Sequence, residues 1–281
     1  MTMHRFPSLR AWPIWALLMV MLAPPAWAEM LISPTRAAMD INNRSATLVL
    51  RNTSDGPKTY RLSWEDKRMT PEGTYEPVAE GEDWPSAAAM VRFSPRQITV
   101  GAGENQTVRL NFRPPADLAS GEYRSHLKLK VIAEESEPAG VIEMGSQDQE
   151  GIGFRLFMQM SFSVPVIVRH QVAPPQVAIE NVEVVPATGD QNMSLAVTLS
   201  RQGESSSYGD LRVEMQQDAN SPVELIGRRK ELYLFTETDR KVVNVPLRDA
   251  AIPAGSWIRI GYEGVAEYDG RLWDERVFQS R

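Results

Sequence analysis

Apolar and polar residues alternate with a period of two along most of the chain from Ala46 onward. Ala46, Leu48 and Leu50 alternate with neighbours that are mostly polar. The same pattern returns in many short segments separated by turn residues such as Asp55-Gly56-Pro57. Successive side chains of a β-strand point to opposite faces, so each segment is typical of a half-buried strand. Further segments of this kind are Tyr60–Trp64, Val108–Phe112, Leu127–Val131, Leu195–Leu199, Leu211–Met215 and Ile258–Tyr262. The pattern predicts an all-β fold of the β-sandwich type.

The alternation stops after Arg169 and resumes a few residues later. The intervening stretch ends in the stiff pair Pro174-Pro175, which suits a hinge between domains. The alternation resumes at Val177 and Ile179, then shifts by one residue, as a β-bulge would require. We therefore expect two β-sandwich domains, residues 29–170 and 171–281.

The segment Asp117–Tyr123 places an acidic residue and a glycine before a tyrosine that opens a strand. This order resembles the tyrosine corner of immunoglobulin-like folds, in which the phenol bonds back to the chain. An ordinary half-buried strand tyrosine is the alternative.

One predicted strand is too long for its domain. Every even position from Phe154 to Val168 is apolar, and at about 3.3 Å per residue the strand would extend roughly 50 Å. Residues 133–153, just before it, are acidic and glycine-rich. We expect part of its apolar edge to project beyond its own sheet, where a partner completes the burial. A long central strand buried by both sheets is the alternative.

The first 28 residues have the features of a cleaved secretory signal peptide. Arg5 and Arg10 give a positive start, an apolar run follows from Ala11 to Ala23, and Ala26-Trp27-Ala28 supplies small residues for cleavage. A membrane anchor is the alternative, but the run is shorter than the roughly 20 residues of a spanning helix. We therefore expect an exported chain in the periplasm, without membrane insertion of the mature part.

Composition excludes several classes of function. The formal net charge is −6 and no basic stripe is present, so nucleic-acid binding is not expected. The chain has no cysteine, which rules out zinc–thiolate sites and cysteine nucleophiles. His126 and His170 are the only histidines after the signal segment, and neither belongs to a recognisable catalytic arrangement. We predict no catalytic residues, no metal and no cofactor.

A set of short motifs then follows in a fixed order along the chain. They are Ser33-Pro34-Thr35-Arg36, Leu48-Val49-Leu50-Arg51-Asn52, Phe93-Ser94-Pro95, Gln106-Thr107-Val108-Arg109-Leu110, Gly121-Glu122-Tyr123-Arg124 and Val164-Pro165-Val166-Ile167-Val168-Arg169. The ordered set resembles the periplasmic pilus-assembly chaperones of the PapD-like type, as a divergent member. The resemblance implies two immunoglobulin-like domains in an L with a cleft between them.

The resemblance also implies a function. Such chaperones bind pilus or fimbrial subunits by donating a β-strand, prevent their aggregation, and deliver them to an outer-membrane usher. The donated side chains would be Leu156, Met158, Met160 and Phe162. Whether the free chaperone hides this strand by self-association is left open.

The family grips the subunit's terminal carboxylate with basic residues in the cleft. Arg36 matches the first of them, with an ordinary solvated arginine as the alternative. Pro165 stands where the family has a lysine, which leaves Arg169 as a weak second candidate. Arg109 and Glu122 match a family ion pair between the domains, and Asp269 is the expected acidic partner from the second domain.

A surface-exposed structural or adhesive fibre protein is the rival function. Such a subunit would lack its own final strand, whereas here the overlong strand lies in mid-chain, ahead of a second domain. This placement favours the chaperone.

Overall fold

The computed structural model describes residues 30–70, 73–132, 141–144, 154–157, 161–189, 192–248 and 252–280, with the backbone alone for 141–144 and 154–157. The predicted signal segment, Met158 and Met160 lie outside these residues. The described chain is built almost entirely of strands, with one short 3-10 turn, η1 (Ala266–Tyr268). The predicted all-β class is confirmed.

Residues 30–170 form a sandwich of two sheets. One sheet has the order β1-β3-β9-β7 and the other has the order β2-β13-β10-β4-β8. The first contains β1 (Met30–Ser33), β3 (Ser45–Asn52), β9 (Asn105–Phe112) and β7 (Val91–Ser94). The second contains β2 (Ala37–Met39), β13 (Ser161–His170), β10 (Gly121–Ile132), β4 (Lys58–Glu65) and β8 (Gln97–Val100).

The first two strands belong to different sheets. β1 pairs with β3 in antiparallel fashion, whereas β2 pairs with β13 in parallel, with Ala37 opposite Val166. The chain therefore crosses from one sheet to the other over residues 34–36. This crossing places Arg36 directly before β2, at the side of the domain that faces the second domain.

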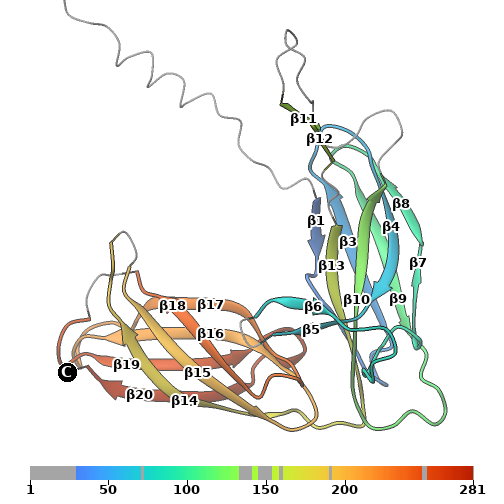
Figure 1. The fold of residues 1–281 in the computed structure, drawn as a ribbon. Coiled ribbons are helices and arrows are strands. Elements are labelled where there is room, and N and C mark those ends of the chain that lie inside the picture. The colour runs from blue at the N-terminus through green and yellow to red at the C-terminus, as the bar shows by residue number, and fades with distance from the viewer. Residues whose placement is uncertain are drawn as a thin grey trace, which may run out of the picture.

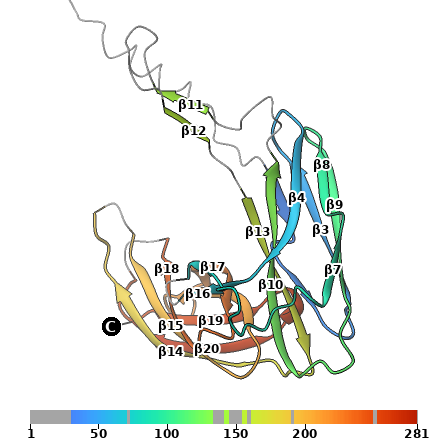
Figure 2. The same cartoon turned by 45° about the vertical axis from the view of Figure 1, so that its right-hand side comes forward.

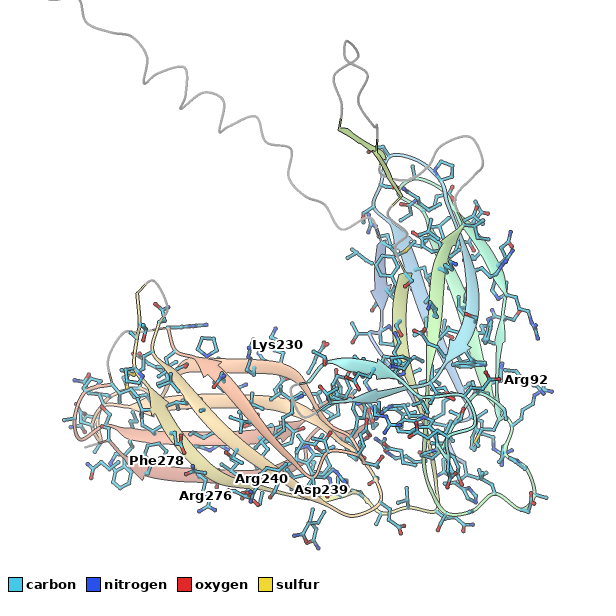
Figure 3. All side chains as sticks on the ribbon, viewed as in Figure 1. Arg92, Lys230, Asp239, Arg240, Arg276 and Phe278 are labelled. Atoms are coloured by element: carbon cyan, nitrogen blue, oxygen red, sulfur yellow. The ribbon has the colours of Figure 1, made fainter. Side chains whose placement is uncertain are left out.

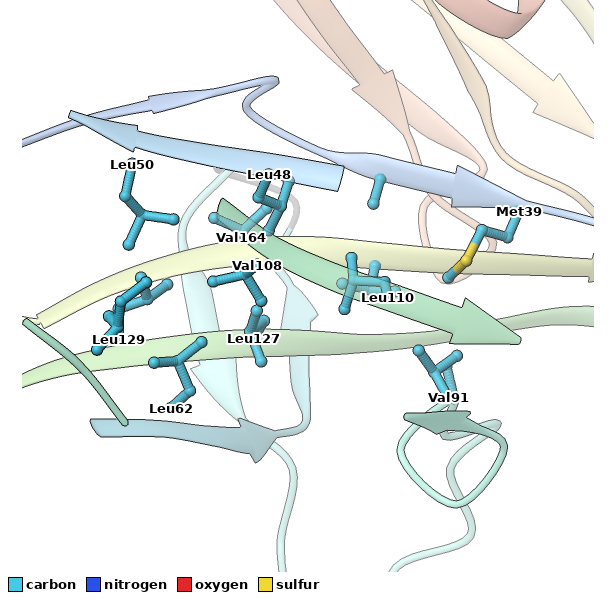
Figure 4. Packing of buried hydrophobic residues seen from close by; sticks show 14 of the residues in the cluster. Met39, Leu48, Leu50, Leu62, Val91, Val108, Leu110, Leu127, Leu129 and Val164 are labelled. Atoms are coloured by element: carbon cyan, nitrogen blue, oxygen red, sulfur yellow. The ribbon is translucent and has the colours of Figure 1, made fainter. Parts of the chain in front are cut away.

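The alternating residues of the first domain form its core. Leu48, Leu50, Leu110, Leu127 and Leu129 are fully buried, and Figure 4 shows them pointing toward one another between the two sheets. Burial of such side chains stabilises a fold by about 1.5–3 kcal/mol each. The period-two interpretation of these segments is confirmed.

The tyrosine corner is also present. The Tyr123 hydroxyl donates a hydrogen bond to the carbonyl of Ala119 at 2.9 Å. It ties the start of β10 to the loop before it, as the resemblance to an immunoglobulin-like fold predicts.

Residues 176–280 form a second sandwich. Its sheets have the orders β14-β15-β18 and β17-β16-β19-β20. The predicted bulge is confirmed, because the register between β14 and β15 shifts between Ile179 and Asn181. The strands are β14 (Gln176–Val185), β15 (Ser194–Gln202), β16 (Ser207–Gln216), β17 (Glu224–Leu234), β18 (Arg240–Pro246), β19 (Trp257–Gly264) and β20 (Leu272–Gln279).

The described parts of the long apolar segment belong to two strands with different partners. β12 (Phe154–Phe157) pairs with β11 (Val141–Met144) in a separate two-stranded sheet, and β13 begins at Ser161. Figures 1 and 2 show the β11–β12 pair beyond the end of the first sandwich. β11 therefore pairs with one edge of β12. The expectation of one strand over residues 154–168 depends on residues 158–160, which lie outside the described residues, and it stays a prediction.

The later part of the segment serves its own domain. Val164, Val166 and Val168 are buried in the first core, and Phe162 packs half-buried against it, with its ring 6.4 Å from that of Tyr60. The surplus of apolar length therefore lies before Phe162.

The two sandwiches form the arms of an L (Figure 1). A hairpin of the first domain, β5 (Lys67–Met69) and β6 (Tyr75–Pro77), reaches across to the second domain. Met69 and Ile167 of the first domain pack against Phe235 and Tyr233 of the second. This apolar cluster joins the arms at the corner of the L.

Candidate functional site: a cleft between the two domains

A cleft of about 690 Å³ lies where the crossing between β1 and β2 faces the second domain. Both domains line it, the first through the crossing and the start of β3, the second through β16, β17 and η1. The charged residues of its walls are Arg36, Asp210, Arg228, Lys230, Glu231 and Glu267. Such an arrangement suits a small charged group or chain end rather than an extended apolar ligand.

Arg36 is the buried cation of this cleft. Arg36 is 5 % exposed, and its guanidinium lies 4.2 Å from the ring centroid of Tyr208. Nη2 pairs with Glu267 of the second domain, while Nε and Nη1 are buried without an acceptor among the described residues. Buried donors without acceptors are costly and uncommon. Arg36 is therefore equipped to receive an additional anion.

Arg169 lies nearby but has no free nitrogen. Its Nε donates to Glu122 at 2.8 Å, its Nη1 to Glu267 at 2.9 Å and its Nη2 to the Ser206 hydroxyl at 3.1 Å. Burial by itself would lower the pKa of Arg169, but Glu122 and Glu267 raise it above its ordinary value. The expected role of Arg169 as a second carboxylate anchor does not fit these contacts.

Glu122 does lie at the domain interface, but with other partners than expected. Besides Arg169, its carboxylate accepts hydrogen bonds from the backbone and hydroxyl of Ser206 in the second domain. Arg109 is exposed on β9, and no ion pair of this residue is found in the described part of the chain. Asp269 is exposed and contacts Ala266 through its backbone.

The expected trio is therefore corrected to Glu122, Arg169 and Glu267. Glu267 lies two residues before the expected Asp269 and contacts both Arg169 and Arg36. Glu267 and Asp269 both lie at η1, and no pattern in the sequence indicates which of them contacts the arginines of the first domain. That contact depends on how the two domains are oriented, and the alternation of apolar residues carries no information about domain orientation.

The edge of β13 next to the cleft is partly open. β10 covers one side of β13 from Ser161 to His170, but β2 covers the other side from Val166 to Val168 alone. Residues 161–165 thus keep one strand edge without a partner strand among the described residues. Pro165 within this stretch is buried against His126 of β10. Because proline has neither a charge nor a backbone N–H, this position supplies no cation to the cleft.

His126 is buried on the outer face of β10, under the β5–β6 hairpin. It is 2 % exposed, its ring lies 5.0 Å from that of Tyr75, and neither ring nitrogen has a hydrogen-bond partner in the described residues. Burial, with the nearby charges of Arg124 and Lys67, lowers its pKa from 6.5 to about 3, and Glu65 opposes this shift. The interpretation of His126 as a structural histidine agrees with these contacts.

The low pKa of His126 predicts a loss of stability in acid. Below pH 6.5 the unfolded chain binds a proton at this residue, whereas the folded chain does not until about pH 3. The stabilising contribution is therefore present above pH 6.5 and falls as the pH drops toward 3, by about 2 kcal/mol at pH 5. In urea titrations between pH 7 and pH 5, His126→Phe should lose about 2 kcal/mol less than the wild type.

The control for this prediction is His170→Phe, which removes the half-buried histidine at the end of β13. Carboxylates titrate in all three proteins, so their contribution cancels in the comparison. Equal losses for the wild type and His126→Phe would contradict the assignment.

Other chemistry is not found in the described residues. No group of histidine, aspartate and glutamate side chains there is arranged to hold a metal ion. The described part also lacks any helix of the length and apolar character needed to cross a bilayer.

Comparisons with known proteins give weak likenesses. No family model and no curated protein matches the sequence. The chain is similar to the Pseudomonas aeruginosa CupB2 chaperone, with 12 % identity and a TM-score of 0.42 over 89 % of this chain and 100 % of that one. It is also similar to a structure of the Salmonella enterica SafA pilin with the SafB chaperone, with 13 % identity and a TM-score of 0.42 over 92 % and 98 %. Values this low leave the function to be argued from the geometry.

Proposed function

We propose that the chain is a periplasmic chaperone that binds pilus or fimbrial subunits by lending them a β-strand. It acts by binding and not as an enzyme. The observation that carries this proposal is the open edge of β13, which leads directly to the buried and partly unpaired guanidinium of Arg36.

The direction of the open edge supports the proposal. A client strand that pairs with residues 161–165 and runs parallel to β13 would follow the path that β2 takes further on. Because β2 begins at Ala37, opposite Val166, the carboxyl end of such a client strand would meet Arg36. Addition of a strand to an exposed sheet edge is a common mode of peptide recognition.

The chemistry of Arg36 suits the end of a chain. A guanidinium can bind both oxygens of a carboxylate through two parallel hydrogen bonds, which fixes position as well as adding affinity. Backbone pairing alone would tolerate slips of two residues. Capture of the terminal carboxylate by Arg36 would therefore set the register of the client strand.

Leu156, Met158, Met160 and Phe162 remain the proposed donated side chains. Phe162 already packs against its own core, so the proposal depends mainly on the other three. Each apolar side chain buried in a client groove would contribute about 1.5–3 kcal/mol before ordering costs. Methionine side chains adapt to grooves of different shape.

Residues 1–28 are proposed to export the chain and to be removed, which places the mature protein in the periplasm. Clients would then be passed to an outer-membrane usher. Exposed strand edges promote association, so the open edge of β13 also makes self-association of the free chaperone a testable part of the proposal.

The donated strand predicts a loss of binding when its side chains become charged. Met158→Asp together with Met160→Asp should abolish complex formation, because two carboxylates would be buried in an apolar groove. Thermal unfolding of the free protein should be unchanged. Pull-down of the client at wild-type level would remove these two residues from the interface.

Co-purification tests the proposed function as a whole. The tagged full-length gene product is expressed with its own leader, recovered from the periplasm, and the proteins bound to it are identified by mass spectrometry. We expect a subunit whose immunoglobulin-like fold lacks its last strand. Recovery of the chain without any such subunit, from cells that express pilus genes, would contradict the proposal.

The fibre protein remains the alternative function. The first domain has its own last strand, β13, paired between β10 and β2, which a subunit of such a fibre would lack. Cell fractionation separates the two functions, since a chaperone stays in the periplasm and a fibre protein is released by shearing.

A further inference from the structure

We infer that Lys230 of the second domain is the second cationic group that binds the client carboxylate, opposite Arg36. The inference rests on the proposed function and names a residue of the same site. Pro165, buried on β13 beside the cleft, carries no charge, so a second cation of this cleft has to come from its other wall. Lys230 lines the same cleft as Arg36, and Figure 3 shows it on the side of the second domain that faces the inside of the L.

A β-bulge presents Lys230 to the cleft. In the pairing of β16 with β17, Gly209 lies opposite Leu232 and Leu211 lies opposite Arg229. Lys230 and Glu231 together therefore face the single residue Asp210. Such an extra residue redirects the side chains of a strand. Both residues of the bulge, Lys230 and Glu231, line the cleft.

The bulge is held in place by a buried carboxylate. Asp210 is 5 % exposed; its Oδ1 accepts the backbone N–H of Glu231 at 2.8 Å and its Oδ2 accepts Nε of Arg228 at 3.1 Å. Glu231 has a φ of 56°, a left-handed conformation that costs a residue other than glycine free energy. Such conformations are often found at binding sites, where the surroundings fix them.

The bulge also touches the first domain beside Arg36. The hydroxyl of Thr35 donates a hydrogen bond to Oε2 of Glu231 at 3.2 Å. Thr35 is adjacent to Arg36 in the chain, and Glu231 is adjacent to Lys230. The contact therefore joins the two segments that carry Arg36 and Lys230. The two walls of the cleft therefore meet at this point.

The other charges of the cleft already have partners. Asp210 binds Arg228, Glu231 accepts from Thr35, and Glu267 pairs with Arg36. For the Lys230 side chain, the described residues provide no ion pair and no hydrogen bond. A bound carboxylate would give it a counter-charge, with Arg36 contributing the directional hydrogen bonds and Lys230 a compact positive charge.

The experiment measures the affinity of the mature protein for two synthetic peptides. Both copy the C-terminal strand of the subunit recovered by co-purification; one ends in a carboxylate and the other in an amide. Lys230→Gln should weaken binding of the acid by about tenfold and leave the amide unchanged, as expected for the loss of one charge-assisted contact. Lys230→Arg should restore most of the affinity for the acid.

Arg229→Gln is the matched control. Arg229 is the next residue on β17, but it donates to the carbonyl of Asn244 on the neighbouring strand and does not line the cleft. Its substitution removes the same charge and should change neither peptide's affinity. Sodium acetate, followed by nitrogen-15 NMR of the arginine Nε and lysine Nζ signals, serves as a probe that needs no client. It should perturb Arg36 and Lys230 but not Arg229.

The outcomes separate the inference from the proposed function. Equal affinity of Lys230→Gln and the wild type for the acid peptide, or acetate shifts at Arg36 that Lys230→Gln leaves unchanged, would overturn the inference alone. If neither peptide binds the wild type, the proposed function itself is wrong.

Discussion

Replacing Glu237 by alanine is expected to destabilise the protein by about 3–5 kcal/mol, because it leaves the buried charge of Arg124 without its partner. Glu237 lies in the turn between β17 and β18, and its carboxylate pairs with both terminal nitrogens of Arg124 from β10. Arg124 is 3 % exposed, so water cannot replace the lost oxygens. The same carboxylate also accepts the backbone N–H of Met69 in the β5–β6 hairpin at 2.8 Å.

The remaining contacts of Arg124 would not compensate for the loss. Its guanidinium lies 3.7 Å from the ring centroid of Phe235 and donates to the carbonyl of Lys67 at 3.1 Å, but neither contact supplies a negative charge. A buried cation that loses its carboxylate costs far more than the intact pair contributes. The double variant with Arg124→Met should therefore be less destabilised than Glu237→Ala alone.

Urea titration measures the loss, and solution X-ray scattering shows whether the arms of the L separate. Asp239→Ala is the matched control. Asp239 lies in the same turn, its side chain is 86 % exposed, and it pairs with the buried Arg201. Its loss should cost only about 1 kcal/mol, because every guanidinium nitrogen of Arg201 keeps a backbone carbonyl acceptor, those of Gly203, Ser205, Phe235 and Thr236. Equal effects of the two substitutions would mean that the Arg124–Glu237 pair does not join the domains.

Alternation predicted those parts of the fold that depend on one strand and its immediate neighbours. Leu127 and Leu129 are buried and Val108 packs against them, as period two requires. The phase shift near Ile179 predicted a bulge that the register contains. Local patterns report which face of a strand is buried, so they succeed wherever the burying partner lies in the same sandwich.

The cleft was predicted much less completely, for a physical reason. Arg36 was identified by resemblance, but its contact with Glu267 joins residues that lie 231 positions apart in different domains. Arg124 and Glu237 were missed, although both lie at the interface. Charged residues on strands normally point to solvent, and the sequence gives no sign that a second domain covers the outer face of β10.

The overlong segment shows the same division. Its apolar even positions from Val164 onward were predicted to share one face of the strand, and they do lie together in the core of the first domain. The pairing of β12 with β11 was not predicted, because alternation shows which face of a strand is apolar and not which strand lies beside it. The partner strand β11 lies within residues 133–153, where apolar and polar residues show no clear alternation.

The second large effect is expected for Arg36→Ala, which should weaken client binding by on the order of 100-fold. The substitution removes the only buried cation on the first-domain wall of the described cleft. It also removes Nε and Nη1, the two guanidinium nitrogens that have no acceptor among the described residues. The free protein should stay folded, because Glu267 keeps its contact with Arg169 at 2.9 Å and no buried acid is left unpaired. Arg36→Lys keeps the charge but loses the forked geometry, so its affinity should be intermediate.

Arg109→Ala provides the control that separates anchoring from loss of charge. Arg109 is an exposed arginine of the same domain, outside the cleft, and its removal changes the net charge by the same amount. Client yield from the periplasm should fall to background in Arg36→Ala and remain at wild-type level in Arg109→Ala, with similar thermal transitions for both. Undiminished client yield in Arg36→Ala would show that the open edge of β13 binds its client without capturing the carboxylate. Register would then have to come from the apolar side chains alone.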